Sequence, residues 1–266
     1  DAFRKNMMNN QQISHLVDFS NSADCFPGVN IAGGVCYFLW ERDFKGMCTV
    51  TNVKGETTTS SMERRIDEYD FFVRDNIALS IVRKIRKGSN LTLNSIVKSY
   101  SYFAIRSYER GENIRQGKDD VILLSSNGRG FFPKDKVQDR ESIINKYKVI
   151  ITYAMSGGNK PSSNGDYQVV SSLQVLKPNE VCTETYLVLG VFEDEQSAIN
   201  MCSYVKTKSF RFLLLQALSS IHITKESFCF VPTQDYSNEW TDEKLYKKYG
   251  LSQEEINFVE SMIKSM

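Results

Sequence analysis

The run Gly34–Trp40 constrains the fold of this chain more than any other stretch. Six apolar residues follow one glycine, and no charge appears until Glu41. A run that is too short for a helix and bounded by turn residues is typical of a strand buried on both faces. The turn Phe26-Pro27-Gly28 comes just before it, and its proline fixes φ and restricts the residue ahead of it. The sequence therefore predicts a core strand entered through a rigid turn.

Length and composition are those of a globular protein without membrane contact. The chain has 266 residues, 41% of them hydrophobic and 24% charged, which suits one large domain or two modest ones. No apolar run is long enough to span a bilayer, and no signal-peptide pattern is present. We therefore expect a cytoplasmic protein. Because the first residue is Asp rather than Met, we also expect a fragment or a processed chain.

The numbers of cysteines, histidines and charges limit which disulfide, metal, catalytic and nucleic-acid sites the chain could form. The six cysteines are widely spaced, and no pair forms Cys-x-x-Cys, which favours reduced thiols. With only His15 and His222, a zinc site or a Ser-His-Asp triad is disfavoured, and we expect no metal. The net charge of +1 means that any nucleic-acid surface must be a local patch.

The first part of the chain resembles the end of an α/β sheet. Residues 1–9 have helical spacing, and residues 13–19, 34–40 and 47–53 read as strands, the last pairing back as a hairpin. The earlier strands that such a sheet needs are missing. Residues 54–62 are polar and without periodicity, which indicates a boundary.

The remainder alternates helices with short strands. Asp75 or Asn76 caps a helix that Gly88 ends, and a shorter amphipathic segment covers residues 91–97. Further strands are expected at 121–125, 149–153, 169–175, 185–192 and 228–231, and further helices at 195–204, 210–218, 241–249 and from 252 onward. The two longest loops are 126–136 and 156–165, and both are rich in glycine and polar residues.

Three groups of cations and small polar residues could contact DNA. They lie in the two long loops and around a helix start, and their members are Arg129, Lys134, Lys136, Asn159, Lys160, Lys206, Lys208 and Arg211. Arginine and lysine contact phosphates or guanine edges, and asparagine suits adenine. A phosphate-cradling loop is absent, since residues 127–130 lack the second half of that motif. The paired carboxylates at 119–120 and 193–195 favour solvated or capping roles.

Six stretches together resemble one protein family. They are residues 16–29, 33–40, 65–68, 181–188, 207–212 and 240–251, and they extend over nearly the whole chain. In these stretches the chain resembles the C-terminal half of the adenine-specific DNA methyltransferases of type II restriction–modification systems. The resemblance is to the TaqI-like gamma class, which includes enzymes fused to an endonuclease.

The resemblance implies a fold and a domain organisation. It implies an α/β protein: the end of a Rossmann-like methyltransferase sheet followed by a mixed α+β target-recognition domain. The implied domains are 1–56 for the last catalytic strands, 57–98 for a helical linker, 99–240 for target recognition and 241–266 for C-terminal helices. The partners would be double-stranded DNA and the rest of the methyltransferase chain.

The resemblance also implies one role near the chemistry. Phe26 falls where such enzymes carry the aromatic ring that stacks on the flipped adenine. S-adenosylmethionine and the catalytic Asn-Pro-Pro-Tyr motif would belong to the full-length enzyme, because this chain contains no Pro-Pro. The fragment alone would then be inactive. Two rivals are a stand-alone DNA-binding specificity module and a scaffold that does not bind DNA, which the balanced charge favours.

Overall fold

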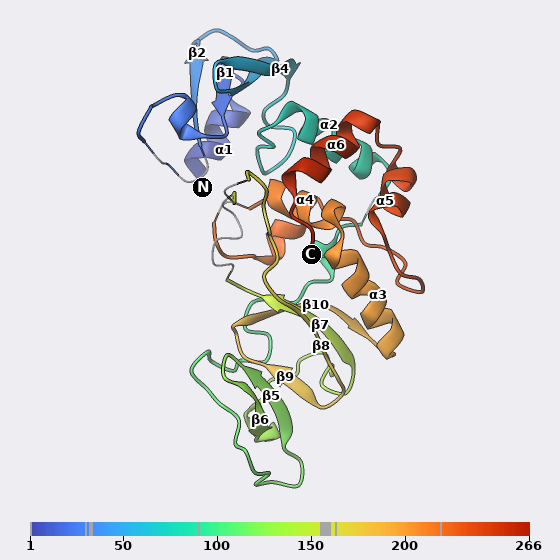
Figure 1. Cartoon of the computed structure of the whole chain (residues 1–266). Coiled ribbons are helices and arrows are strands. Elements are labelled where there is room, and N and C mark those ends of the chain that lie inside the picture. Colours follow the sequence, from blue (N-terminus) through green and yellow to red (C-terminus); the bar gives the residue numbers. More distant parts are fainter. Residues whose placement is uncertain are drawn as a thin grey trace. The chain divides into compact units, whose positions relative to one another are not determined.

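Ten strands in three sheets and six α-helices occur in the residues that the computed structural model describes, which are 2–29, 31, 34–89, 91–154, 161–162, 164–218 and 220–266. The chain divides into two units, Asp1–Lys84 and Ile85–Met266 (Figure 1). Both units combine helices with sheets of mixed strand direction, so the protein is mixed α/β.

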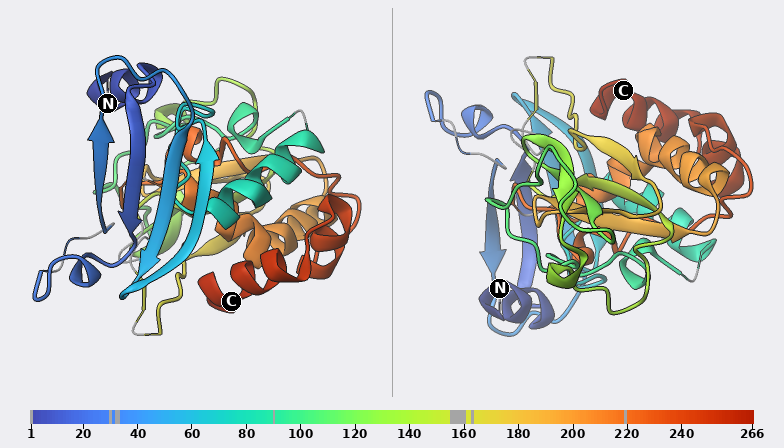
Figure 2. Two further views of the ribbon diagram at one scale, coloured as in Figure 1. Left: turned by 90° about the horizontal axis from the view of Figure 1, so that it is seen from above. Right: turned by 90° about the horizontal axis from the view of Figure 1, so that it is seen from below.

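The N-terminal unit contains a four-stranded sheet of order β2-β1-β3-β4, whose strands lie side by side in Figure 2. β1 (Ile13–Phe19) pairs antiparallel with β2 (Val35–Trp40) and parallel with β3 (Cys48–Lys54). β4 (Thr57–Arg64) pairs antiparallel with β3. The core of this unit is formed by α1 (Ala2–Asn9), the middle strands and a following segment, through Met8, Ile13, Leu16, Cys48, Val50 and Ile66.

The predicted burial of the run Gly34–Trp40 is wrong. β2 is a strand as expected, but it lies at the edge of the sheet, and five of its six residues are exposed. Tyr37 is 57% exposed and Phe38 is 44% exposed, and as successive residues of a strand they point to opposite faces. An apolar run indicates that both faces of a strand are suited to burial. It does not identify the residues that pack against those faces.

Two further expectations for this unit are also wrong. β3 was expected to pair back onto β2, but it pairs with β1 on the opposite side, so the connection from β2 crosses over β1. Residues 57–64 were expected to begin a linker, but they form β4, whose register runs from Cys48–Arg64 to Lys54–Thr57. Its threonines and serines alternate with few apolar residues, which hid the strand.

The helix that links the units begins and ends where the sequence predicts. It is α2 (Asn76–Lys87). The Asp75 carboxylate accepts hydrogen bonds from the amides of Ile77 and Ala78, at 2.8 and 3.3 Å, which makes Asp75 the cap.

The C-terminal unit contains two three-stranded sheets. The first has the order β10-β7-β8, formed by Tyr186–Phe192, Tyr147–Thr152 and Leu173–Leu176. The second has the order β6-β5-β9, formed by Gly128–Phe132, Val121–Ser125 and Glu180–Cys182. One apolar core joins residues of both sheets, among them Leu123, Ile150 and Val188.

Helices cover the first of these sheets. α3 (Glu195–Lys206) packs against all three of its strands, and α4 (Lys208–Gln216) packs against α5 (Asp242–Tyr249) and α6 (Gln253–Met262). Three local predictions fail in this unit. Residues 228–231 are not a strand, residues 91–97 contain only a short 3-10 helix (Leu93–Ser95), and the expected loop 126–136 contains β6.

Candidate functional site

The described residues between β1 and β2 lie at the carboxyl edge of the N-terminal sheet. β1 and β3 are parallel, so both strands end at this edge. After β1 the chain continues into these residues, and after β3 it continues into the turn Gly55-Glu56. The Gly55 amide donates to the Asp24 carboxylate at 2.7 Å, which ties the turn to these residues. In α/β sheets, ligands bind at the carboxyl ends of the strands. We call the described residues 20–29, 31 and 34 the edge loop.

Ser22 holds the edge loop in shape. Its side chain is buried, and its hydroxyl donates to the Val29 carbonyl and accepts from the Ile31 amide, both at 2.8 Å. The Phe26 amide donates to the Ser22 carbonyl at 2.8 Å, and the Val29 amide donates to the Phe26 carbonyl at 3.0 Å. One buried hydroxyl and a few backbone bonds therefore fix the turn that carries Phe26.

Phe26 itself projects into solvent. Its side chain is 53% exposed, and its loop neighbours Val29 and Ile31 are exposed as well. A large aromatic ring on a well-bonded turn exposes apolar area that folding could bury, so its position points to a ligand or partner. The role of Phe26 in base stacking stays a prediction.

A partly buried ion pair lies where the edge loop leaves β1. The Arg74 guanidinium donates to the Asp18 carboxylate at 3.0 and 2.7 Å, and to the Phe19 carbonyl at 3.1 Å. Burial raises the pKa of Asp18, and the Arg74 charge offsets part of that shift. Gly34 has φ +71°, and a Cβ there would lie 2.2 Å from the Phe19 carbonyl oxygen. Only glycine fits where the loop returns past the end of β1.

A second buried arginine fixes the segment ahead of α2. Arg64 on β4 is 2% exposed, and its guanidinium donates to the carbonyls of Val73 and Arg74 at 2.8 and 2.9 Å. Burial lowers the pKa of Arg64 to about 10. These contacts hold the Arg74 backbone, so they position the side chain that pairs with Asp18.

The predicted DNA contacts on the β5–β6 hairpin lie on one short stretch of chain. Arg129 is exposed on β6, where its guanidinium lies 3.5 Å from the Glu180 carboxylate and 3.4 Å from the Gln174 side chain. Lys134 and Lys136 are exposed on the 3-10 helix (Lys134–Lys136) that follows β6. These three cations therefore lie close together along the chain, on β6 and on the 3-10 helix that follows it.

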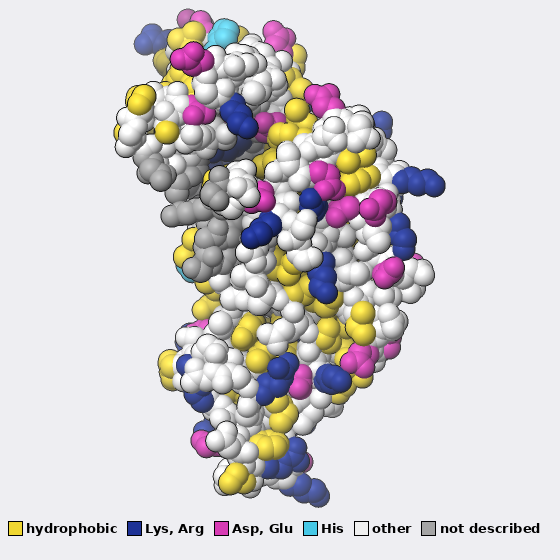
Figure 3. All heavy atoms as spheres, viewed as in Figure 1, with side chains coloured by type: hydrophobic (Ala, Val, Ile, Leu, Met, Phe, Trp, Pro, Cys, Tyr) yellow, Lys and Arg dark blue, Asp and Glu magenta, His cyan; other side chains and the backbone are white. Residues whose placement is uncertain are grey.

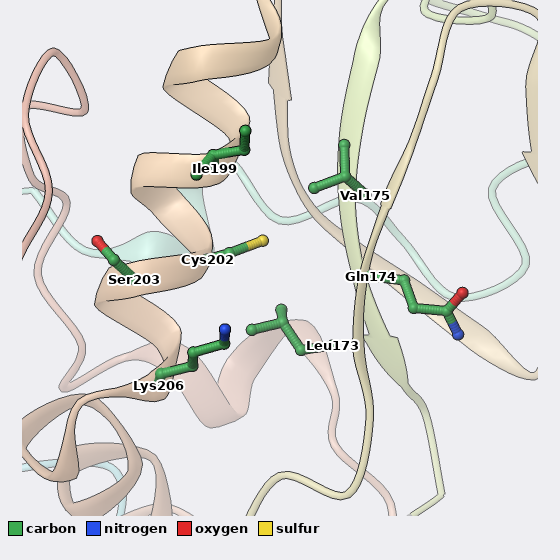
Figure 4. A pocket seen from close by; sticks show the side chains of 7 residues that line it. All are labelled: Leu173, Gln174, Val175, Ile199, Cys202, Ser203 and Lys206. Carbon is green, nitrogen blue, oxygen red and sulfur yellow. The ribbon is translucent and has the colours of Figure 1, made fainter. Parts of the chain in front are cut away.

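The predicted contacts around α4 behave differently. Lys206 is exposed at the end of α3 and lines a shallow hollow of about 310 Å³ between α3 and β8, where it faces Leu173 (Figure 4). Lys208 is mostly covered, and its ammonium pairs with the Glu260 carboxylate at 2.6 Å. The ion pair with Glu260 gives Lys208 a role inside the fold.

Arg211 cannot contact DNA in this structure, which corrects that prediction. Its side chain is 1% exposed, and its guanidinium donates to backbone carbonyls, the shortest bonds being to Lys264 at 2.6 Å and to Lys206 at 3.0 Å. The arginine cross-links α4, the end of α3 and the C-terminal segment. The predicted contacts Asn159 and Lys160 lie outside the described residues.

Two other reactive side chains in the described residues, His222 and Cys182, have surroundings that favour structural roles. The His, Cys, Asp and Glu side chains of the described residues form no cluster that could hold a metal ion. His222 is exposed, and its ring stacks on that of Tyr153 with the centroids 5.0 Å apart. Burial raises the pKa of the Cys182 thiol to about 12, which keeps it protonated and unreactive. None of the helices in the described ranges has the length and apolar character needed to cross a membrane.

Sequence reasoning missed the residues that shape the edge loop. Ser22 and Asp24 carry its hydrogen bonds, yet the sequence indicates only a polar strand end at Ser22 and gives Asp24, at the start of the turn stretch, no bonding role. Asn21 gives a signal that could have found them, because its side-chain oxygen accepts the Ala23 amide at 3.2 Å and begins the 3-10 helix Ser22–Asp24.

Comparisons with known proteins give partial matches. No protein-family model matches the chain. It is 34% identical over 70 residues to an uncharacterized adenine-specific methylase of Mycoplasma pneumoniae, a match that covers 26% of this chain and 16% of that protein. It is 22% identical over 181 residues to the small ribosomal subunit biogenesis GTPase RsgA of Borrelia recurrentis, covering 64% of this chain and 58% of that protein.

The first match indicates a relationship to methyltransferases. In both cases the chain spans less than two thirds of the length of the relative. At 22% identity over 58% of that protein, the second match does not indicate a function for this chain.

Proposed function

We propose that this chain is part of a site-specific DNA adenine methyltransferase of a type II restriction–modification system, of the TaqI-like gamma class. In this proposal the edge loop forms one side of the flipped-base pocket, and the C-terminal unit reads the DNA sequence. The observation that carries it is the exposed ring of Phe26, fixed on a turn at the carboxyl edge of parallel strands. The partial similarity to an adenine-specific methylase supports a methyltransferase-like function.

Base flipping gives the fixed ring a physical purpose. Extruding a base from a duplex costs a few kcal/mol, and an aromatic side chain can return about 1–3 kcal/mol by stacking on it. A ring whose backbone is already held by Ser22 and followed by Pro27 loses little conformational freedom when it stacks. The edge loop therefore has the rigidity that a stacking platform needs.

The open edge of β2 supports a larger catalytic sheet. Among the described residues, β2 has one neighbouring strand, and its side chains are apolar and exposed on both faces. A strand with this pattern suits the interior of a sheet, where a second strand pairs with it and layers cover both faces. We propose that the rest of the methyltransferase chain supplies that strand.

The hollow beside α3 does not fit a site for S-adenosylmethionine. The hollow between β8 and α3 is lined by Leu173, Gln174, Val175, Ile199, Cys202, Ser203 and Lys206. It offers no carboxylate for the amino group or the ribose hydroxyls of the cofactor. We therefore assign no step of methyl transfer to residues of this chain, and place the cofactor elsewhere in the proposed enzyme.

The test is methylation by the longer protein that contains this chain. Phe26→Ala should slow methylation of a duplex about 5- to 150-fold, which corresponds to the loss of 1–3 kcal/mol of stacking, while duplex affinity stays unchanged. Phe26→Trp should retain most of the rate because it keeps an aromatic face. The fluorescence of 2-aminopurine at the target adenine would report extrusion of the base directly.

Two results would count against the proposal. Equal methylation rates for wild type and Phe26→Ala would remove Phe26 from the base pocket. Duplex binding without any methyl transfer from S-adenosylmethionine by the longer protein would favour a stand-alone specificity module instead.

A further inference from the structure

The segment 111–120 is docked against β6 along its backbone. The Glu112 amide donates to the Phe131 carbonyl at 2.7 Å, and the Phe131 amide donates back to the Glu112 carbonyl at 2.8 Å. Beside this pair, Gly111 and Gly130 touch directly, since a Cβ on Gly111 would lie 2.4 Å from the Gly130 carbonyl carbon. Two glycines are needed for this close approach, which fixes one end of the segment.

A buried carboxylate fixes the other end. Asp120 is 6% exposed, and its Oδ2 accepts hydrogen bonds from the amides of Gln116 and Gly117, at 2.9 and 2.8 Å. Only three residues, 113–115, separate Glu112 from this second anchor. A stretch so short between two anchors has little conformational freedom, so Arg115 starts from a constrained backbone.

The side chain of Arg115 is held as well. Its guanidinium carbon lies 5.1 Å from the centre of the Phe131 ring, and its Nη1 reaches the Lys118 carbonyl at 3.4 Å. Stacking on an aromatic face leaves the in-plane N–H donors of a guanidinium available. Arg115 is exposed, and within the described part of the chain it forms no ion pair.

Other cations lie on the same stretch of chain as Arg115 or on the strand that carries Phe131 and the 3-10 helix after it. Arg129 lies two residues from Phe131 on the same strand, so both side chains point to one face of the sheet. Lys118, Lys134 and Lys136 are exposed and make no ion pair among the described residues. In Figure 3, lysine and arginine side chains gather at the end of the C-terminal unit where Figure 1 places β5 and β6.

We infer that Arg115, held by Phe131, is a DNA-contacting residue that donates two parallel N–H bonds to a pair of acceptors on duplex DNA. The inference rests on the proposed function and adds a residue that none of the predicted contacts includes. A planar guanidinium matches two acceptor arrangements on DNA, the oxygens of a phosphate and the O6/N7 edge of a guanine. Holding the guanidinium in advance lowers the entropy lost on binding.

The test measures duplex binding by this chain with fluorescence anisotropy. The probes are a 30-base-pair duplex of mixed sequence and sequences selected from a randomised duplex pool. Arg115→Ala and Arg115→Lys should each weaken binding, by about 5- to 100-fold for the alanine variant. Phe131→Leu should also weaken binding, because it keeps every charge but removes the ring. Lys247→Ala is the matched control, since it removes one exposed charge from α5.

Salt dependence and sequence preference separate the two acceptor sources, and either result supports the inference. A phosphate contact predicts uniform weakening across sequences and a salt slope lower by about 1 in Arg115→Ala. A guanine contact predicts that Arg115→Ala loses the preference for guanine at one position of the selected sequences. Arg115→Lys should lose the same preference, because its ammonium cannot form the bidentate pair.

Other results overturn the inference. If Arg115→Ala binds duplex as tightly as Lys247→Ala does, while both retain the wild-type circular dichroism spectrum, Arg115 does not contact DNA. If poly-glutamate binding weakens by the same factor, the surface is a general anion site. If the wild-type chain binds no duplex even at low salt, both the proposed function and the inference are wrong. If the wild-type chain binds duplex but Arg115→Ala binds equally well, only the inference is wrong.

Discussion

We expect the stability of the C-terminal unit to rise between pH 8 and 10.5, and this rise to vanish in Lys148→Met. Lys148 lies on β7 and is 0% exposed. Its ammonium donates to four backbone carbonyls, those of Ile143, Ile144, Lys146 and Lys177, at 3.3, 2.8, 2.7 and 3.3 Å. Burial lowers the pKa of Lys148 from 10.5 to about 8.

The sign follows from comparing the folded and unfolded states. A lysine with a folded pKa of about 8 and an unfolded pKa near 10.5 is protonated only in the unfolded chain between these values. Raising the pH through this interval removes the proton from the unfolded state, so the free energy of unfolding increases and then levels off. A difference of about 2.5 units at 1.36 kcal/mol each gives a rise of about 3 kcal/mol. The four carbonyl acceptors stabilise the charged ammonium, so this value is an upper bound.

The assay is urea unfolding at pH values from 7.5 to 10.5, followed by the fluorescence of Trp240. Trp40→Phe in both proteins leaves Trp240 as the reporter, and this residue belongs to the C-terminal unit. Burial also raises the pKa of tyrosines such as Tyr204, which lowers stability at high pH, but that effect is common to both proteins and cancels in the difference. Parallel pH curves for Lys148→Met and its parent would refute the reasoning.

Three substitutions test other parts of the fold by urea unfolding. Ser22→Ala should cost about 1–3 kcal/mol in the N-terminal unit, because the Val29 carbonyl and the Ile31 amide lose their shared partner; Ser20→Ala is the matched control. Gly130→Ala should destabilise the C-terminal unit by about 1–3 kcal/mol, since its Cβ would lie 2.5 Å from Gly111 and backbone cannot yield; a silent substitution would contradict this packing. Ser252→Ala should cost about 1 kcal/mol by breaking the capping box with Glu255, and Ser265→Ala should not.

Local signals in the sequence predicted the helices well because the residues that define helix ends are close together. Asp194, Thr241 and Ser252 each cap a helix by accepting an amide three residues onward, and Gly250 ends α5 in the left-handed conformation. Such contacts need only a few consecutive residues. They are therefore visible in a single sequence.

Contacts between distant residues were harder to predict. A strand pattern shows that residues 48–54 form a strand, but the choice between β1 and β2 as its neighbour depends on the whole sheet. Dependence on distant residues also explains why the burial of Arg211 was not predicted. Arg211 reads as a surface cation next to two lysines, yet its guanidinium satisfies backbone carbonyls that come from residues up to 53 positions away. No local pattern marks a buried arginine of this kind.

Two features of the N-terminal unit, the exposed edge strand β2 and the exposed ring of Phe26, are both explained by one additional strand beside β2. Edge strands in natural proteins often carry lysine, proline or a bulge that blocks pairing. β2 instead contains two aliphatic residues, one cysteine and three aromatic residues. An exposed apolar edge of this kind readily pairs with another strand. Phe26 is likewise fixed in position with its ring uncovered. In the proposed enzyme, a partner strand on β2 would extend the carboxyl edge at which Phe26 lies, so the same neighbour would both cover the strand and form part of the proposed base pocket.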